Sequence, residues 1–190
     1  FIKNKNDFIR EIRKDLTIAI SGRPGPVWLD IPLDIQWSEI SYTKKSKILK
    51  TKQNTKVNKS KINNFYKLCK NSKKPLLLMG FGCRLSDPKI KNIENFIKRE
   101  QIPFVTTWNA KDFFPTSHNL NLGTIGMSGQ RGANKAIFSS DLIICIGSHL
   151  SIPHTTTLYK DYAKQAKKVI INIDKNQLEN LNIKFDLKIC

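Results

Sequence analysis

Residues 129–147, GQRGANKAIFSSDLIICIG, decide how the larger part of this chain folds. The spacing of their apolar residues predicts a short helix over 130–139, and the apolar run that follows predicts a buried strand over 141–147. A helix that leads directly into a strand with apolar residues on both faces is typical of a parallel sheet covered by helices.

The same alternation extends on both sides of this stretch. The pattern predicts helices over 62–69, 88–100, 158–165 and 176–181, strands over 75–79, 103–106 and 168–173, and the beginning of a last strand at 185–187. Strands that are separated by helices need crossover connections. From about residue 60 onward we therefore expect an α/β fold, a doubly wound parallel sheet of the Rossmann-like kind.

The first part of the chain has a different pattern. Apolar residues at three- and four-residue steps predict an amphipathic helix over Asp7–Ile20. The run SGRPGPVWLDIPLDIQ, residues 21–36, predicts a sharp turn and then a short strand over 27–31 that ends at Pro32. The pattern alone predicts a helix–turn–strand unit, followed by a lysine-rich linker over 37–59.

Composition excludes several classes of protein. The chain has 190 residues, 39% of them hydrophobic, and no apolar run approaches the roughly 18 residues that cross a bilayer. The four cysteines, Cys69, Cys83, Cys145 and Cys190, are widely spaced and form no CxxC motif. This pattern predicts free thiols in a reducing compartment, the cytoplasm, and no metal site. The three histidines are scattered through loops and predict no catalytic pair.

The net charge of +18 raises the alternative of a nucleic-acid-binding protein. The charge is concentrated in Lys44–Lys74, which contains twelve lysines and no acidic residue. Phe65 and Tyr66 are the aromatic residues interleaved with these lysines, and most of the stretch coincides with the predicted linker. A solvated basic linker explains the charge, and we expect no nucleic acid and no membrane among the partners.

Four loops follow the predicted strands on one edge of the sheet, where ligands of open parallel sheets bind. Two of these loops are rich in glycine, which lets backbone N–H groups approach a phosphate closely. The candidate nucleotide-contacting residues are Gly80, Gly82, Arg84, Gly126, Gly129, Gly147, Ser148 and Asp174. Each loop alone is also compatible with an ordinary connecting turn. A stand-alone domain that binds FAD, NAD or ADP without catalysis is therefore one alternative.

Four segments resemble one enzyme family. SGRPGPVWLDIPLDIQ (21–36), PLLLMGFGCR (75–84), GTIGMSGQRGANKAIFSSDLIICIGSHL (123–150) and KKVIINID (167–174) are similar to thiamine diphosphate (ThDP) enzymes of the acetolactate synthase type. The resemblance identifies residues 1–36 as a helix–strand remnant of a second α/β domain, the end of a pyrimidine-binding domain. It identifies 37–59 as a linker and 60–190 as the Rossmann-like central domain.

The resemblance also implies chemistry. A complete enzyme of this kind uses ThDP and Mg²⁺ to decarboxylate a 2-keto acid or join it to an acceptor, and it is a homodimer or homotetramer. The family's glutamate lies upstream of these segments and its metal motif lies downstream, so we expect this chain alone to be inactive, with no catalytic residue and no metal ligand of its own. The resemblance places nucleotide contacts at seven of the candidate residues, all except Arg84. The run Ser148–His154 departs from the FAD-binding members, which disfavours FAD.

Overall fold

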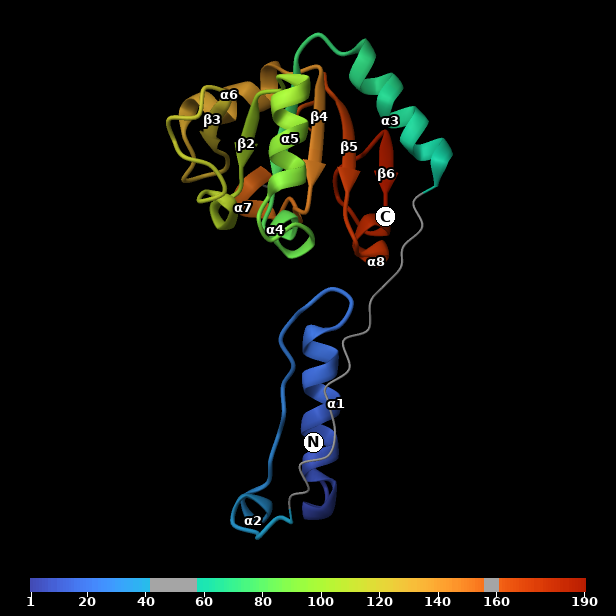
Figure 1. The fold of residues 1–190 in the computed structure, drawn as a ribbon, viewed down its shortest axis with the longest axis vertical. Helices are drawn as coiled ribbons and strands as arrows, with labels where there is room; N and C mark the ends of the chain where they lie inside the picture. Colours follow the sequence, from blue (N-terminus) through green and yellow to red (C-terminus); the bar gives the residue numbers. More distant parts are fainter. Residues whose placement is uncertain (42–57, 156–160) are drawn as a thin grey trace. The chain divides into compact units, whose positions relative to one another are not determined.

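A parallel sheet organises the carboxyl-terminal part of the chain, as Figure 1 shows for the computed structural model, which describes residues 1–41, 58–155 and 161–190. Its strands are β1 (Pro75–Met79), β2 (Phe104–Thr106), β3 (Asn121–Thr124), β4 (Leu142–Ile146), β5 (Lys167–Ile171) and β6 (Leu187–Ile189). The strand order is β3-β2-β1-β4-β5-β6, and every neighbouring pair is parallel. The predicted doubly wound α/β fold is confirmed.

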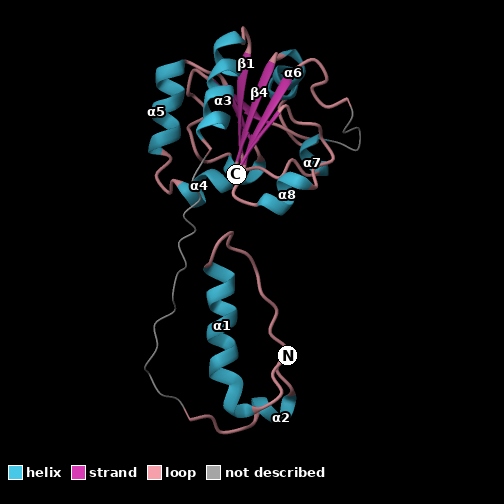
Figure 2. Ribbon diagram, turned by 90° about the vertical axis from the view of Figure 1, so that its right-hand side faces the viewer, coloured by secondary structure: helices cyan, strands magenta, loops and turns pink. Residues whose placement is uncertain are grey.

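Helices cover both faces of the sheet, with α3 and α5 on one side and α6 and α8 on the other (Figure 2). The helices of this part are α3 (Lys59–Asn71), α4 (Gly82–Ser86), α5 (Lys91–Glu100), α6 (Arg131–Ser139), α7 (Ile152–Thr155) and α8 (Lys175–Glu179), with a 3₁₀ turn, η2, at Trp108–Ala110. The core therefore has two layers, one on each face of the sheet.

Strand β1 shows how the sequence fills both layers. Leu76 and Leu78 pack into the layer that contains Ala133 and Ile137 of α6, while the alternate residues of β1 pack into the layer beneath α3 and α5. Successive side chains of a strand point to opposite faces. A continuous apolar run such as PLLLM is therefore required when both faces are covered.

Two elements differ from their predicted bounds near β1. The helix predicted over 88–100 begins only at Lys91, because Ile90 has a left-handed backbone with a φ of 55° that cannot continue a helix. Asp87 still serves the helix end, since its carboxylate accepts a hydrogen bond from the Asn92 N–H at 2.7 Å. The short helix α4 forms where the sequence predicted a simple turn.

Two further predictions need correction. Strand β3 lies within residues 107–129, where the sequence predicted neither a helix nor a strand, and it pairs with β2 at the edge of the sheet. Residues 161–165, the described part of the helix predicted over 158–165, form turns. Ala163 has a φ of 45° there, which interrupts any helix.

The amino-terminal part forms a unit of its own, Phe1–Thr55, and the rest of the chain forms a second unit, Lys56–Cys190. Its described residues contain a 3₁₀ turn, η1 (Lys5–Asp7), and the helices α1 (Phe8–Ile20) and α2 (Leu33–Gln36), and the predicted helix is confirmed. The strand predicted over 27–31 is wrong, because this stretch is extended but pairs with no strand in the described residues. The one backbone contact to it is Ile2 N–H donating to the Asp30 carbonyl at 3.0 Å. Residues 42–57 of the predicted linker lie outside the described residues.

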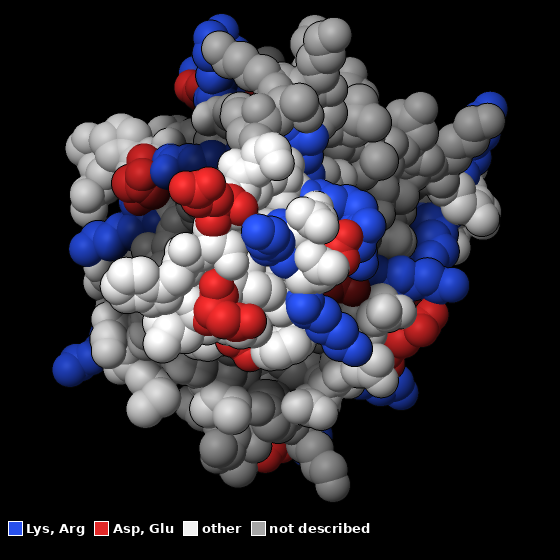
Figure 3. Space-filling view, turned by 90° about the horizontal axis from the view of Figure 1, so that it is seen from below, with Lys and Arg blue, Asp and Glu red and all other residues white. Residues whose placement is uncertain are grey.

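The amino-terminal unit has a small core. Ile2 and Ile35 are its buried residues within 1–41, whereas Trp28 is 91% exposed and Trp37 is 84% exposed. The space-filling view in Figure 3 shows uncharged atoms gathered on one face of this unit, with charged side chains around them. Among the described residues, no helix has the length and apolar content that a membrane crossing needs.

We expect residues 1–36 to exchange their amide hydrogens quickly. Helix α1 has no buried residue, so its hydrogen bonds open without losing apolar contacts. Hydrogen exchange on the full chain should label this segment at least about 100-fold faster than the amides of Leu142–Ile146, which form the centre of the sheet. Protection in residues 1–36 equal to that of β4 would contradict this expectation.

The carboxylate of Asp141 ties the end of α3 to the sheet. It accepts hydrogen bonds from the Ser72 hydroxyl, from the Lys73 N–H at 2.7 Å and from the Lys74 N–H at 3.0 Å. Partial burial raises the pKa of Asp141. The three hydrogen bonds lower this pKa by more than burial raises it, so the net shift is downward. A lowered folded-state pKa stabilises the fold above the unfolded value of about 3.9, and this stabilisation is lost as the pH falls through the folded-state value.

Replacing Asp141 with asparagine is therefore expected to cost about 1 kcal/mol of unfolding free energy at pH 7. The difference from the unsubstituted chain should begin to shrink as the pH falls below about 3.9, and it should vanish only below the lowered folded-state pKa, where Asp141 is protonated in the folded chain as well. Urea unfolding at pH 7 and at pH 3 measures both values. Asp161→Asn is the control, since the side chain of Asp161 is 64% exposed and its Lys164 contact is 3.9 Å long.

Candidate functional site

The sheet reverses its strand order between β1 and β4, and the loops after these two strands meet at that point. Ligands of open α/β sheets bind at such a reversal. Gly80 and Gly82 follow β1, and Gly147 and Ser148 follow β4. The structure therefore brings four of the predicted site residues together.

Glycine is required here because the two loops touch through their backbones. A Cβ on Gly80 would lie 2.3 Å from the Gly147 carbonyl oxygen, and a Cβ on Gly82 would lie 2.8 Å from the Gly147 Cα. The Gly82 N–H donates to the Gly147 carbonyl at 2.9 Å. Ser148 is buried, and its hydroxyl accepts a hydrogen bond from the Leu150 N–H at 3.2 Å. These residues pack closely against one another at the point where the strand order reverses.

Gly126 and Gly129 lie in the loop between β3 and α6. The side chain of Asn134 on α6 makes two hydrogen bonds with Gly126. It accepts one from the Gly126 N–H and donates one to the Gly126 carbonyl, both at 2.9 Å. A Cβ on Gly126 would lie 2.5 Å from the Pro153 carbonyl oxygen. This loop is therefore packed against the segment that follows β4, and it contributes backbone to the same edge of the sheet.

Asp174 follows β5, the next strand along the sheet. Its carboxylate accepts a hydrogen bond from the Gln177 N–H at 3.1 Å and so caps α8. The side chain of Gln177 also contacts the His149 ring, which connects the loops after β4 and β5. In the structure, Asp174 supports its own helix on the edge where the sequence predicted a ribose or adenine contact.

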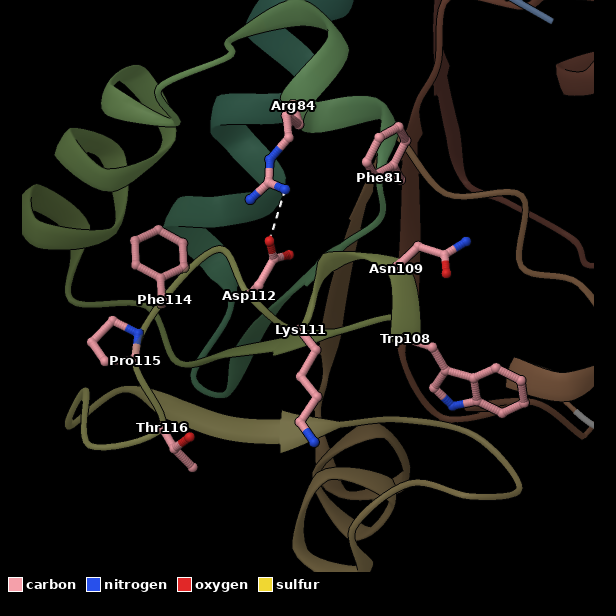
Figure 4. Close-up of a pocket in the computed structure, with 9 residues that line it drawn as sticks. All are labelled: Phe81, Arg84, Trp108, Asn109, Lys111, Asp112, Phe114, Pro115 and Thr116. Carbon is pink, nitrogen blue, oxygen red and sulfur yellow. Dashed lines mark hydrogen bonds and ion pairs between the residues drawn. The ribbon is translucent and has the colours of Figure 1, made fainter.

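Arg84 is directed away from the glycine loops, into a hollow at the carboxyl ends of β1 and β2 (Figure 4). Its Nη1 lies 2.8 Å from an oxygen of Asp112, and its guanidinium lies 4.6 Å from the centre of the Phe113 ring. The hydrogen bond from Arg84 lowers the pKa of Asp112. Sequence reasoning placed Arg84 beside a phosphate, and the structure places it beside a carboxylate.

The hollow has a volume of about 780 Å³ and is lined by Phe81, Arg84, Trp108, Asn109, Lys111, Asp112, Phe114, Pro115 and Thr116. Apart from Arg84, none of these residues was among the predicted site residues. They come from α4 and from the segment after β2, so no local motif groups them. The clustering of aromatic and charged residues in 107–114 was the available signal.

Histidine and cysteine offer no metal centre. No group of three or more histidine, cysteine or acidic side chains that could hold a metal ion occurs within residues 1–41, 58–155 and 161–190. His154 packs edge-on to Trp108 with the ring centres 5.5 Å apart, and burial lowers the pKa of His154. Burial raises the pKa of Cys83 to about 12. Within the part of the chain that the structure describes, no three such side chains are therefore grouped around a possible metal position.

Comparison with known proteins gives a consistent result. A family described as "thiamine pyrophosphate enzyme, central domain" matches residues 62–190. A probable acetolactate synthase large subunit of Methanocaldococcus jannaschii is 33% identical over 195 residues, which cover 99% of this chain and 32% of that protein. The acetolactate synthase large subunit of Corynebacterium glutamicum is 34% identical over 175 residues, 91% of this chain and 28% of that protein.

A plant protein is similar over the same length. Acetolactate synthase 2, chloroplastic, of Nicotiana tabacum is 30% identical over 198 residues, which cover all of this chain and 29% of that protein. The chain thus spans less than a third of the length of these relatives. The similarity includes the amino-terminal unit as well as the sheet.

Proposed function

We propose, from the premise that this chain belongs to the thiamine pyrophosphate enzyme family through its central domain, that it is the middle part of an enzyme acting on 2-keto acids. The supporting observation is that acetolactate synthases are similar over 98 to 100% of the chain in three of the relatives, so that both units are matched together. In the proposed reaction, a 2-keto acid loses CO₂. The remaining carbanion-like fragment then adds to a second carbonyl compound or takes up a proton.

Thiamine diphosphate supplies the carbanion chemistry of such a reaction when it is bound. The described residues offer no metal cluster, so no step of the reaction is assigned to a side chain of this chain. The contribution proposed for residues 58–190 is structural, a rigid sheet covered on both faces. We further propose that the complete enzyme is a homodimer or homotetramer and that it lies in the cytoplasm. The four free cysteines support the cytoplasmic location.

The edge of the sheet supports a second proposal, that this domain contacts a nucleotide. Gly80, Gly82 and Gly147 lie at the reversal of strand order, and Ser148, Gly126, Gly129 and Asp174 lie on the same edge. The glycines there pack against protein backbone, so the support for a ligand is the position of these loops at the reversal of strand order. We propose that this ligand is an adenine nucleotide such as ADP, because Ser148–His154 departs from the pattern of the FAD-binding members.

The test of the proposed activity uses the full-length protein with ThDP, Mg²⁺ and pyruvate. We expect release of CO₂ and formation of acetolactate, and no turnover by the 190-residue chain expressed alone. Failure of the full-length protein to consume pyruvate or other short 2-keto acids would overturn the proposal. Calorimetric titration of the same protein with ADP and with FAD tests the nucleotide separately, and the absence of ADP binding would overturn that part only.

A further inference from the structure

The hollow lies at the carboxyl ends of β1 and β2, next to the glycine loops, and has a chemistry of its own. We propose that it binds a flat aromatic carboxylate, with the ring against Phe81 and Trp108 and the carboxylate on Arg84. The proposal does not depend on the activity proposed above. It rests on the lining residues, their exposure and their charges.

The aromatic wall is the first argument. Phe81 is 43% exposed and Trp108 is 42% exposed, and both rings lie on the same side of the hollow as Asn109 (Figure 4). Trp108 is held in place by its edge-on contact with His154, with ring centres 5.5 Å apart. Large aromatic surfaces that stay exposed within a concave site are typical of ligand pockets, and they favour a flat partner that can stack.

The cation in the lining is the second argument. Arg84 is already oriented toward a carboxylate, because its Nη1 contacts one oxygen of Asp112 at 2.8 Å. The guanidinium carbon also lies 4.6 Å from the centre of the Phe113 ring, a contact that favours the cation there. A guanidinium has five N–H donors and pairs with a carboxylate through two of them. Arg84 can therefore accommodate a second carboxylate, or exchange Asp112 for one.

Asp112 is the partner that can leave. Its side chain is 68% exposed, against 34% for Arg84, so water already competes for this ion pair. Lys111 also lines the hollow, which gives two cationic groups and one carboxylate in the lining. An incoming carboxylate would thus meet an excess of positive charge. A ligand without a negative charge would gain only the stacking.

We choose a carboxylate as the anionic group because the protein's own carboxylate, on Asp112, already contacts Arg84 through one oxygen. The volume of about 780 Å³ is sufficient for a two-ring ligand. The probe is therefore 2-naphthoate, with 2-naphthamide as its neutral counterpart and 2-naphthyl phosphate as its phosphate-bearing counterpart.

The test is calorimetric titration of the full chain with 2-naphthoate. We expect binding at sub-millimolar concentration and at least about 10-fold weaker binding of 2-naphthamide, because the charge-assisted contact is lost. Arg84→Gln should weaken 2-naphthoate at least about 10-fold. Asp112→Asn should strengthen it a few-fold, because the competing carboxylate is removed while the side-chain shape is kept.

Arg99→Gln is the matched control, since Arg99 also pairs with a neighbouring carboxylate, on Glu100, and stacks on an aromatic ring, Phe96. It should leave the affinity unchanged. Circular dichroism of each variant verifies that the fold is intact. The proposal is overturned if 2-naphthoate does not bind, if R84Q and R99Q weaken it equally, if D112N weakens it, or if 2-naphthyl phosphate binds more tightly than 2-naphthoate.

Discussion

Replacing Gly147 with alanine is expected to lower the unfolding free energy of the carboxyl-terminal unit by about 3 kcal/mol. Gly147 has a φ of +61°, where an alanine Cβ is strained. The added Cβ would also lie 2.5 Å from the Cys83 nitrogen and 2.7 Å from the Gly82 carbonyl carbon. Both neighbours are backbone atoms, so neither can rotate away as a flexible side chain would.

Urea unfolding measures this effect cleanly if one tryptophan reports on the unit. The chain has three tryptophans, and Trp28 and Trp37 belong to the amino-terminal unit. Fluorescence of Trp108 in a W28F and W37F background therefore follows the carboxyl-terminal unit alone. The substitution is then compared within this background, so that any effect of the two phenylalanines cancels.

Gly132→Ala is the matched control for the same chemical change. A Cβ at Gly132 meets nothing within 4 Å, and the residue lies in helix α6, where alanine is the better helix former. We expect G132A to be as stable as the unsubstituted chain or about 1 kcal/mol more stable. If G147A and G132A unfolded at the same urea concentration, the close contact between the loops after β1 and β4 would be wrong.

The sequence predicted the elements whose apolar runs are buried on both faces. Strand β1 has its predicted bounds, and β4 lies within the predicted 141–147, because PLLLM and LIICI have no polar face to place in water. Strand β3 was missed because Asn121–Thr124 is short, contains a glycine and lies at the edge of the sheet. Its residues form a strand only because β2 provides a partner.

The opposite error occurred in the amino-terminal unit. The stretch around Val27–Ile31 has strand-forming residues, yet a strand exists only where another strand completes its hydrogen bonds. The described residues of that unit provide no such partner. In both errors the local pattern was informative about the side chains but carried no information on the pairing.

The candidate site shows a similar division. The glycines at the reversal of strand order were predictable, because positive φ and close approach require glycine. The hollow was not, because Phe81, Arg84 and Asp112 are brought together by the tertiary fold and have no fixed spacing. Only the enrichment of aromatic and charged residues after β2 pointed toward it.

Phe104→Ala is expected to have the largest effect of the substitutions considered, about 3 to 5 kcal/mol. Phe104 is fully buried in β2, and its ring centre lies 4.8 Å from that of Phe114 and 5.2 Å from that of His118. Truncation removes these ring contacts and leaves a cavity in the core layer. The strands around this cavity cannot move enough to fill it. The same urea experiment, with Trp108 as reporter, measures the loss.

Phe138→Ala is the control, because Phe138 is 60% exposed and its truncation should cost less than about 1 kcal/mol. Phe104→Leu separates volume from aromatic contact, and we expect it to lie between the unsubstituted chain and F104A. Because Phe114 lines the hollow and packs on Phe104, F104L should also weaken 2-naphthoate while the fold remains intact. Equal stability of F104A and F138A would contradict the packing of this layer, whereas unchanged 2-naphthoate affinity in F104L would show that Phe114 holds its position without the ring beneath it.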